Sequence, residues 1–276
     1  MLVSVFLLLI SSQVFSQAVK PDFRKLAEQR SGKSLAVFCP VDTDPTAHRL
    51  FAEYGAVFIA NTEVVIPFKC VFSNEDEVRE FQANANPKSV VLDGVSVTLQ
   101  APAMEALLKA REKAAQAGLR ISPRGGSPAA KRSYEDTRGL WNSRFLPGLN
   151  YWVKKGKLGK NEADAARRLS TEAQVGQVLE WETNSKLFFS KDLSKSILYS
   201  VAAPGASQHN FMLAIDVQQF ADKRVRAVMA EFGWFQTVKS DLPHFTYLGR
   251  KENELSSWGL KQVFIDGQSF WIPDIE

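Results

Sequence analysis

Two short segments in the last third of the chain place the strongest constraint on its fold, because each joins a strand-like run to a histidine and an aspartate. The first, 207–216, contains His209 and ends at Asp216. The second, 240–245, contains Asp241 and His244, so two of the three histidines of the chain fall in these segments. Two imidazoles and two carboxylates are the side chains of a zinc site with three protein ligands, one open position and a nearby general base.

The spacing in the first segment restricts how its side chains can meet. His209 and Asp216 are seven residues apart, and residues at odd separation in one continuous strand face opposite sides of a sheet. We therefore expect a loop or bulge between them. Pro204-Gly205 indicates a turn that places His209 on a loop before a strand at 213–217.

The second segment can bring its two functional groups to one pocket. Pro243 favours an extended backbone before it, so a tight turn can orient Asp241 and His244 together. One zinc ion per chain would then bind His209, Asp216 and His244 and leave a position open for water, whose proton Asp241 would accept. The alternative is that these side chains only pack, as isolated histidines and aspartates usually do. His48 stands alone, and we expect it at the surface or in a helix cap.

The composition is that of a globular protein with an apolar core. The chain has 276 residues, 45% hydrophobic and 23% charged, which allows one large domain or two small ones. The net charge of +4 and the pI of about 9.0 are compatible with an anionic polymer such as nucleic acid, an anionic membrane surface or a cell-wall polymer. The basic residues form no long run, which favours a solvated, mildly basic surface as the simpler interpretation.

The first 17 residues, MLVSVFLLLISSQVFSQ, contain no charged side chain. The apolar run is shorter than the ~20 residues that span a bilayer. We interpret 1–17 as a secretory signal peptide with cleavage near Val14-Phe15-Ser16. An uncleaved interfacial anchor is the alternative, and no stable membrane span is expected after signal removal. We expect the protein in the periplasm or cell envelope.

The expected export bears on the state of the two cysteines. An even pair in an oxidising compartment is more often a disulfide than a metal site, so Cys39 and Cys70 are expected to be bonded. The enclosed loop would contribute roughly 3–4 kcal/mol in the chain-entropy model. Two buried free thiols are the alternative.

Hydrophobic periodicity and turn residues predict an α+β fold, with helices first and antiparallel strands later. The strongest hairpin signal is Asp93-Gly94 within 90–99, and a closing hairpin is expected at 262–272. The predicted strands outside these hairpins are 34–39, 56–60, 64–72, 119–121, 195–201, 213–217, 234–238 and 244–248. The predicted helices include 102–117, a helix that starts near 132 and is interrupted at Pro147-Gly148, 161–179 and 222–232.

Residues 201–216 resemble the Ser-x-His-x-x-x-x-x-x-Asp motif of the LAS-type zinc peptidases. This family contains D-alanyl-D-alanine carboxypeptidases, related dipeptidases and L-alanyl-D-glutamate endopeptidases. Asp241-Leu242-Pro243-His244 resembles the second motif of the family, acid-x-x-His, and Arg132-Ser133-Tyr134-Glu135 resembles an upstream segment whose arginine lies in the substrate site. The three motifs occur in the family order, and the resemblance covers about residues 100–250. It implies a LAS-type core in which an antiparallel sheet holds the zinc site and helices pack on one side.

The resemblance implies a role for each matching residue. His209, Asp216 and His244 match the zinc ligands, and Asp241 matches the catalytic acid/base. Arg132 matches the arginine that binds the substrate. Ser207 matches the motif serine, whose hydroxyl would bond near the ligands or the substrate; its alternative role is a turn cap.

The sequence also departs from the family pattern. Met212 stands where many members have glycine, which permits a positive φ or a close backbone approach. Lys131 stands before Arg132 where tyrosine is common, and Arg124 is a second candidate for the substrate arginine. Aspartate at 241 is typical of the endopeptidases, whereas the carboxypeptidases commonly have glutamate.

From these features we expect an exported zinc peptidase that hydrolyses D-amino-acid-containing stem peptides of peptidoglycan, with no nucleic-acid partner. A D,D-carboxypeptidase is the first interpretation. An L,D-endopeptidase, a non-catalytic zinc-containing module that binds the cell wall and a purely structural exported domain are the alternatives. The peptidase domain is expected at 101–276, preceded by an accessory lobe or a structural extension at 18–100.

Overall fold

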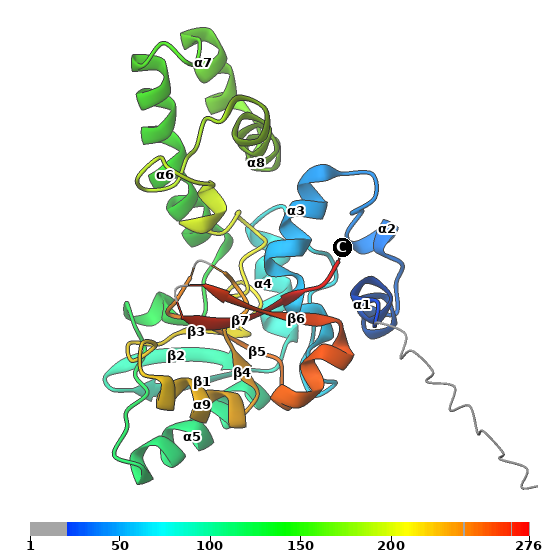
Figure 1. Ribbon diagram of the computed structural model, residues 1–276, viewed down its shortest axis with the longest axis vertical. Helices are drawn as coiled ribbons and strands as arrows, with labels where there is room; N and C mark the ends of the chain where they lie inside the picture. Colours follow the sequence, from blue (N-terminus) through cyan, green and yellow to red (C-terminus); the bar gives the residue numbers. More distant parts are fainter. Residues whose placement is uncertain (1–20, 240, 266, 276) are drawn as a thin grey trace, which may run out of the picture.

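The site-forming part of the fold is a three-stranded antiparallel sheet in a mixed arrangement of helices and small sheets (Figure 1). The computed structural model describes residues 21–239, 241–265 and 267–275. The predicted signal peptide at 1–17 lies outside these residues. Within the described ranges, no helix combines the length and the apolar character that crossing a membrane requires.

The central sheet has the strand order β3-β5-β4, formed by β3 (Ala214–Asp216), β5 (His244–Tyr247) and β4 (Trp234–Phe235). Both pairings are antiparallel, and Asp216 lies directly opposite His244. Helix α9 (Lys223–Glu231) precedes β4 and is capped by the Asp222 side chain, which accepts a hydrogen bond from the Arg224 amide. These strands confirm the predicted strands at 213–217, 234–238 and 244–248 and the predicted α+β class.

Two hairpins complete the β structure. One consists of β1 (Pro87–Leu92) and β2 (Val95–Gln100), and the other of β6 (Leu260–Ile265) and β7 (Gln268–Pro273). Asp93 and Gly94 in the first turn have φ values of 50° and 81°, as a two-residue turn of this hand requires. Both predicted hairpins are confirmed. Helix α5 (Ala101–Gln116) follows β2 directly and matches the predicted helix at 102–117.

Between residue 21 and β1, the structure has helices and irregular chain where strands were predicted. It contains α1 (Phe23–Ser31), α2 (Leu35–Phe38), α3 (Pro45–Tyr54), the 3-10 helix η1 (Gly55–Ile59) and α4 (Glu75–Asn84). The predictions of strands at 34–39, 56–60 and 64–72 were therefore wrong. Short apolar runs fit a buried helical turn as well as a buried strand, and all five residues of η1 are buried. Cys39 and Cys70 form the predicted disulfide, with a Cα–Cα distance of 5.2 Å.

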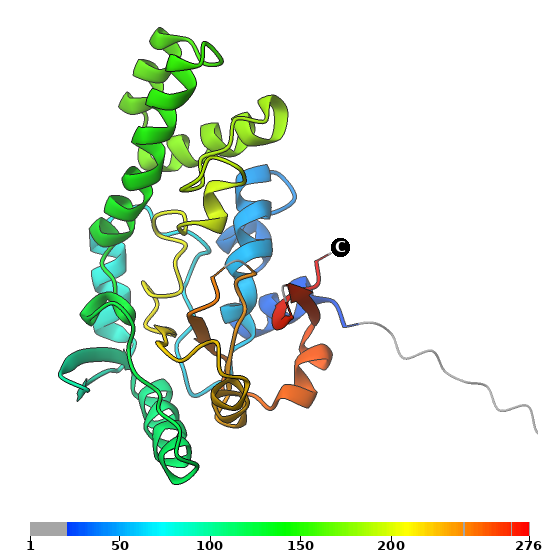
Figure 2. The same cartoon turned by 60° about the vertical axis from the view of Figure 1, so that its left-hand side comes forward.

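Three helices form a lobe that projects from the sheet (Figure 2): α6 (Tyr134–Lys154), α7 (Lys160–Arg168) and α8 (Thr171–Glu180), which continues into a π-helical turn at Trp181–Ser185. A capping box formed by Ser133 and Asp136 starts α6. The predicted interruption at Pro147-Gly148 was wrong, because α6 continues through it. The single helix predicted at 161–179 was wrong as well, since Leu169 is extended and Ser170 caps a new helix.

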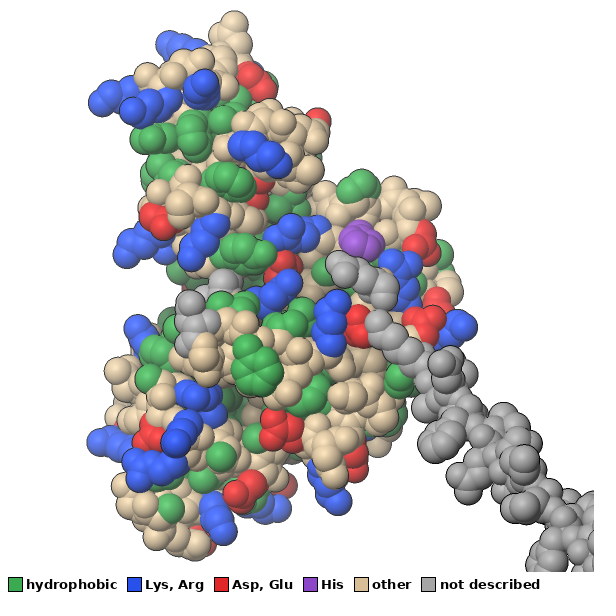
Figure 3. Space-filling model, in the orientation of Figure 1, with side chains coloured by type: hydrophobic (Ala, Val, Ile, Leu, Met, Phe, Trp, Pro, Cys, Tyr) green, Lys and Arg blue, Asp and Glu red, His purple; other side chains and the backbone are tan. Residues whose placement is uncertain are grey.

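The remaining elements are short 3-10 helices at Ser127–Ala129, Ile197–Tyr199 and Glu252–Trp258. The 3-10 helix Ile197–Tyr199 replaces the strand predicted at 195–201. No strand forms at the predicted 119–121; two residues later, Pro123 forms an isolated β-bridge with Val217. Lys and Arg side chains are distributed over the face in Figure 3, from the helical lobe to the lower body. This distribution agrees with the absence of a long basic run in the sequence.

Two apolar cores hold these parts together. The larger contains residues from α1, η1 and α4 together with Ile215, Phe245 and Trp271. Residues before 100 therefore pack directly on the sheet. The smaller core joins the helical lobe to Leu50 and Tyr54 of α3 and to the chain around Ala203 and Ala206. The loop that leads to His209 lies between the two cores.

Candidate metal centre

His209 lies on a buried turn, as the odd spacing to Asp216 required. The Asn210 amide donates to Ser207 O at 2.9 Å, and the Met212 amide donates to His209 O at 3.2 Å. Met212 is buried and has a φ of 54°, in the left-handed region. The position where many LAS peptidases have glycine therefore adopts the conformation for which glycine is suited, although a methionine occupies it.

A close backbone contact fixes the start of this loop. Gly205 has a φ of 80°, and a Cβ there would lie 1.9 Å from Phe72 O. Its carbonyl accepts a hydrogen bond from the Phe72 amide at 3.0 Å. Phe72 follows Cys70 by two residues, so the disulfide-bonded segment before 100 supports the loop that carries His209.

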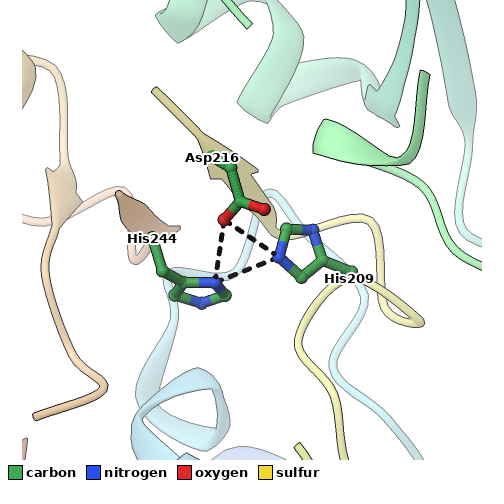
Figure 4. A group of neighbouring side chains, drawn as sticks. All are labelled: His209, Asp216 and His244. Atoms are coloured by element: carbon green, nitrogen blue, oxygen red, sulfur yellow. Dashed lines mark hydrogen bonds and ion pairs between the residues drawn. The ribbon is translucent and has the colours of Figure 1, made fainter. Parts of the chain in front are cut away.

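The strand register supplies the other two groups. Asp216 ends β3 and His244 begins β5 directly opposite, and His209 approaches from the loop (Figure 4). Asp216 Oδ1 lies 3.4 Å from His209 Nε2 and 3.6 Å from His244 Nδ1. The two ring nitrogens are 3.0 Å apart. The structure thus brings together the three residues that the sequence predicted as metal ligands.

The outer nitrogen of each ring contacts an acceptor, which determines the tautomers. His209 Nδ1 lies 2.7 Å from Ala130 O, and a carbonyl oxygen only accepts. His244 Nε2 lies 2.8 Å from Gln208 Oε1. We assign the proton of each neutral imidazole to this outer nitrogen. The inner nitrogens, His209 Nε2 and His244 Nδ1, are then both lone-pair donors.

The donor atoms fit a tetrahedral zinc ion. With bond lengths of about 2.0–2.2 Å, tetrahedral zinc holds its ligand atoms roughly 3.3–3.6 Å apart. The three distances here are 3.0, 3.4 and 3.6 Å. Asp216 Oδ1 is buried without a hydrogen-bond partner, which is costly for a carboxylate oxygen unless a cation binds it. Two imidazoles and one carboxylate with an open position form a zinc donor set of the catalytic type.

The electrostatics keep these groups in the protonation states that bind a metal. Burial, reinforced by the positive charge of Arg132, lowers the pKa of His209 to about 4, so this ring is neutral at pH 7. Burial opposes ionisation of Asp216, but its contacts with the rings of His209 and His244 lower its pKa well below the usual range. Metal ligands must be deprotonated, and His209 and Asp216 meet this condition before a metal arrives.

Arg132 contacts the metal centre directly. Its Nη2 donates to Asp216 Oδ2 at 2.6 Å, and its Nε donates to Pro128 O at 2.7 Å. It therefore orients the carboxylate so that Oδ1 faces the histidines, while its side chain also lines the adjoining cavity. Arg124, the second candidate for the substrate arginine, is exposed and lies over the Phe220 ring at 5.1 Å.

A cavity of about 230 Å³ opens next to the ligands, and Ser207, His209, Asp241 and His244 line it. Asp241 is half-buried and is not among the three residues whose donor atoms converge. Burial raises the pKa of the Asp241 carboxyl above its ordinary value; Asp216 adds to the rise and His244 opposes it. A raised pKa suits a carboxyl group that accepts and returns a proton near neutral pH.

Three contributors were missed by the sequence reasoning: Gln208, Arg144 and the Ala130 carbonyl. Gln208 is buried and accepts from His244, while its Nε2 donates to Tyr54 O at 3.0 Å. Arg144 lines the cavity from α6. Gln208 neighbours His209 in the sequence, which was a usable signal, but no sequence pattern indicated Arg144 or a carbonyl oxygen.

Comparisons with known proteins give little independent support. No family model matches the chain, and no curated protein matches it. Among solved structures, it is similar to a mutant of the vancomycin-resistance D,D-pentapeptidase VanY in complex with Zn(II), with 16% identity and a TM-score of 0.36 over 63% of this chain and 84% of that chain. VanYB in complex with D-alanine-D-alanine matches with 16% identity and a TM-score of 0.37, over 64% of this chain and 86% of that chain. Such overlaps carry no argument, so the site rests on its own geometry.

Proposed function

We propose that the protein is a zinc-dependent peptidase. The observation that carries this proposal is the convergence of three lone-pair donors, His209 Nε2, His244 Nδ1 and Asp216 Oδ1, beside a cavity lined by Asp241. Structural packing alone does not explain why two ring nitrogens and an unpartnered carboxylate oxygen face one another. A metal ion satisfies all three.

The residues around the cavity have distinct roles in this proposal. Zinc, when bound, supplies the Lewis acidity that polarises a scissile carbonyl and activates water. Asp241 accepts the proton of the attacking water and returns it to the leaving amine. Arg132 holds Asp216 and presents its planar guanidinium to the substrate. Ser207 contributes to the cavity wall, where its hydroxyl can contact the ligands or the substrate.

The proposed substrate is a D-amino-acid-containing stem peptide of peptidoglycan, cleaved as a D,D-carboxypeptidase would cleave it. Three sequence motifs in the family order support this substrate class. The segment 1–17 and the disulfide between Cys39 and Cys70 support export to the periplasm or cell envelope. Residues 101–276 would contain the catalytic apparatus, and residues 18–100 would support its loop.

Metal analysis and product analysis of variants test the proposal. His209→Ala and His244→Ala should lose stoichiometric zinc and all hydrolysis, whereas Asp241→Ala should retain zinc and lose hydrolysis. Zinc is measured by elemental mass spectrometry, and products by mass spectrometry of digested muropeptides. Loss of a terminal alanine identifies a carboxypeptidase, and a cut inside the stem identifies an endopeptidase. Wild-type protein that binds no zinc, or an Asp241→Ala product profile equal to that of the wild type, would refute the peptidase.

A further inference from the structure

One face of α6 forms part of the wall of the cavity that His209 and His244 also line. Thr137, Leu140 and Arg144 line the cavity, and their spacing of three and four residues places them on the same side of the helix. Arg144 therefore belongs to the cavity through regular helix geometry. Its placement does not depend on a surface loop.

The guanidinium of Arg144 is held in place without a carboxylate. Its Nε donates to Ser200 Oγ at 2.9 Å, and its Nη1 donates to Ser143 Oγ at 3.0 Å. None of the ion pairs among residues 21–239, 241–265 and 267–275 involves Arg144. Ser143 and Ser200 are neutral, so they orient the guanidinium and leave its full charge available.

The other arginine in the cavity wall has a different set of partners. Arg132 pairs with Asp216 Oδ2 and also bonds Pro128 O. Its charge is thereby largely compensated by a metal ligand. Of the two arginines that line this cavity, Arg144 is the one with an uncompensated charge, and a bound molecule with a negative group would be drawn to it.

We propose that Arg144 binds the terminal carboxylate of the peptide substrate and so determines specificity for a free C-terminus. This inference rests on the proposed peptidase function and names the substrate class of the same site. Arginine presents a planar fork that matches a carboxylate in two parallel hydrogen bonds. Arg132, already bonded to Asp216, is then left to contact the scissile carbonyl.

The size of the cavity agrees with this assignment. Its volume of about 230 Å³ is below the roughly 300–1,000 Å³ of pockets that enclose drug-sized ligands. A single terminal residue and its carboxylate fit such a space.

Arg144→Gln tests the assignment with two probes, N-acyl-D-alanyl-D-alanine and its C-terminal amide. With the zinc-loaded wild-type protein, the amide should show a KM about 10- to 100-fold above that of the acid, the range for a charge-assisted hydrogen bond. Arg144→Gln should raise the KM of the acid by a similar factor, leave the amide unchanged and retain zinc. Arg144→Lys should fall between the two proteins. Arg138→Gln, on an exposed side of α6, is the matched control and should behave as the wild type.

Binding measurements separate this inference from the proposed activity. Calorimetry with D-alanyl-D-alanine and its amide measures recognition of the carboxylate even if no bond is cleaved. Preference for the acid that disappears in Arg144→Gln, without hydrolysis in any protein, would support the carboxylate site and refute the peptidase. Equal affinity of the wild type for acid and amide, or no binding of either, would overturn the role of Arg144 whether or not the protein hydrolyses other peptides.

Discussion

Replacing Gln208 by leucine should weaken zinc binding although Gln208 is not a ligand. Its Oε1 accepts the hydrogen bond from His244 Nε2 at 2.8 Å, and this bond keeps the other nitrogen, Nδ1, free for the metal. Loss of such an outer partner typically lowers metal affinity 10- to 100-fold, which corresponds to about 1.4–2.8 kcal/mol. We expect an increase of this size in the zinc dissociation constant, measured by competition with a chelating dye.

The same change also removes hydrogen bonds that stabilise the fold, so a matched control is required. Gln208 makes hydrogen bonds to Tyr54 O, His244 and the hydroxyls of Thr237 and Thr246. Loss of these four bonds at ~1 kcal/mol each would lower the free energy of unfolding by about 4 kcal/mol. Gln100 is equally buried and makes three bonds to Val65 and Phe211. Gln100→Leu should lose similar stability in urea unfolding and keep wild-type zinc affinity.

Two outcomes would refute this reasoning. If Gln208→Leu binds zinc as tightly as the wild type, the hydrogen bond to His244 does not determine the tautomer. If Gln100→Leu weakens zinc binding as much as Gln208→Leu, the loss reflects general loosening of the core. The absorption spectrum of the cobalt-substituted protein provides a second readout, because altered coordination at His244 changes the spectrum and loosening elsewhere does not.

Two further predictions concern stability. Hydrogen bonding to Arg111 lowers the pKa of Asp93 to about 2. This carboxylate therefore stabilises the fold above its unfolded pKa of about 4, and the contribution is lost as the pH falls through about 2. Allowing for solvent screening, Asp93→Asn should cost about 1 kcal/mol at pH 7 and much less at pH 2, where the folded-state carboxyl is about half protonated; equal unfolding free energies of wild type and variant at pH 7 would contradict this. Removing the disulfide by Cys39→Ala and Cys70→Ala should lower the free energy of unfolding by about 3–4 kcal/mol. The reduced wild-type protein should lose a similar amount. An unchanged urea midpoint would exclude a stabilising disulfide.

The sequence was sufficient to predict which three side chains converge, because the proposed ligands combine rare residue types with local spacing rules. The odd separation of His209 and Asp216 required a loop, and the structure has one. The opposition of Asp216 and His244 depends on strand register, which only the folded sheet determines. Met212 shows that residue type alone does not predict backbone conformation, because it adopts a left-handed φ although it is not a glycine.

The errors occurred where local pattern is ambiguous. The apolar run at 56–60 satisfies a strand and a buried 3-10 helix equally, and packing against the core decided for η1 (Gly55–Ile59). Pro147 disfavours a helix locally, yet α6 continues through it. Residues on both sides of the proline, Trp141 and Phe145 before it and Leu149 after it, are buried in the smaller core. In such cases tertiary packing overrides local secondary-structure propensity, and the sequence of one segment does not show how that segment will pack.

The ion pair between Arg132 and Asp216 has a consequence for the charge balance of the centre. With His209 neutral, the charge of Asp216 is already offset by a guanidinium, so the protein ligands together with Arg132 contribute no net formal charge. A bound divalent cation would therefore keep most of its two positive charges. Such a centre is strongly electrophilic and attracts anions. Neutralising Arg132 would therefore make the metal a weaker Lewis acid even if every ligand remained in place.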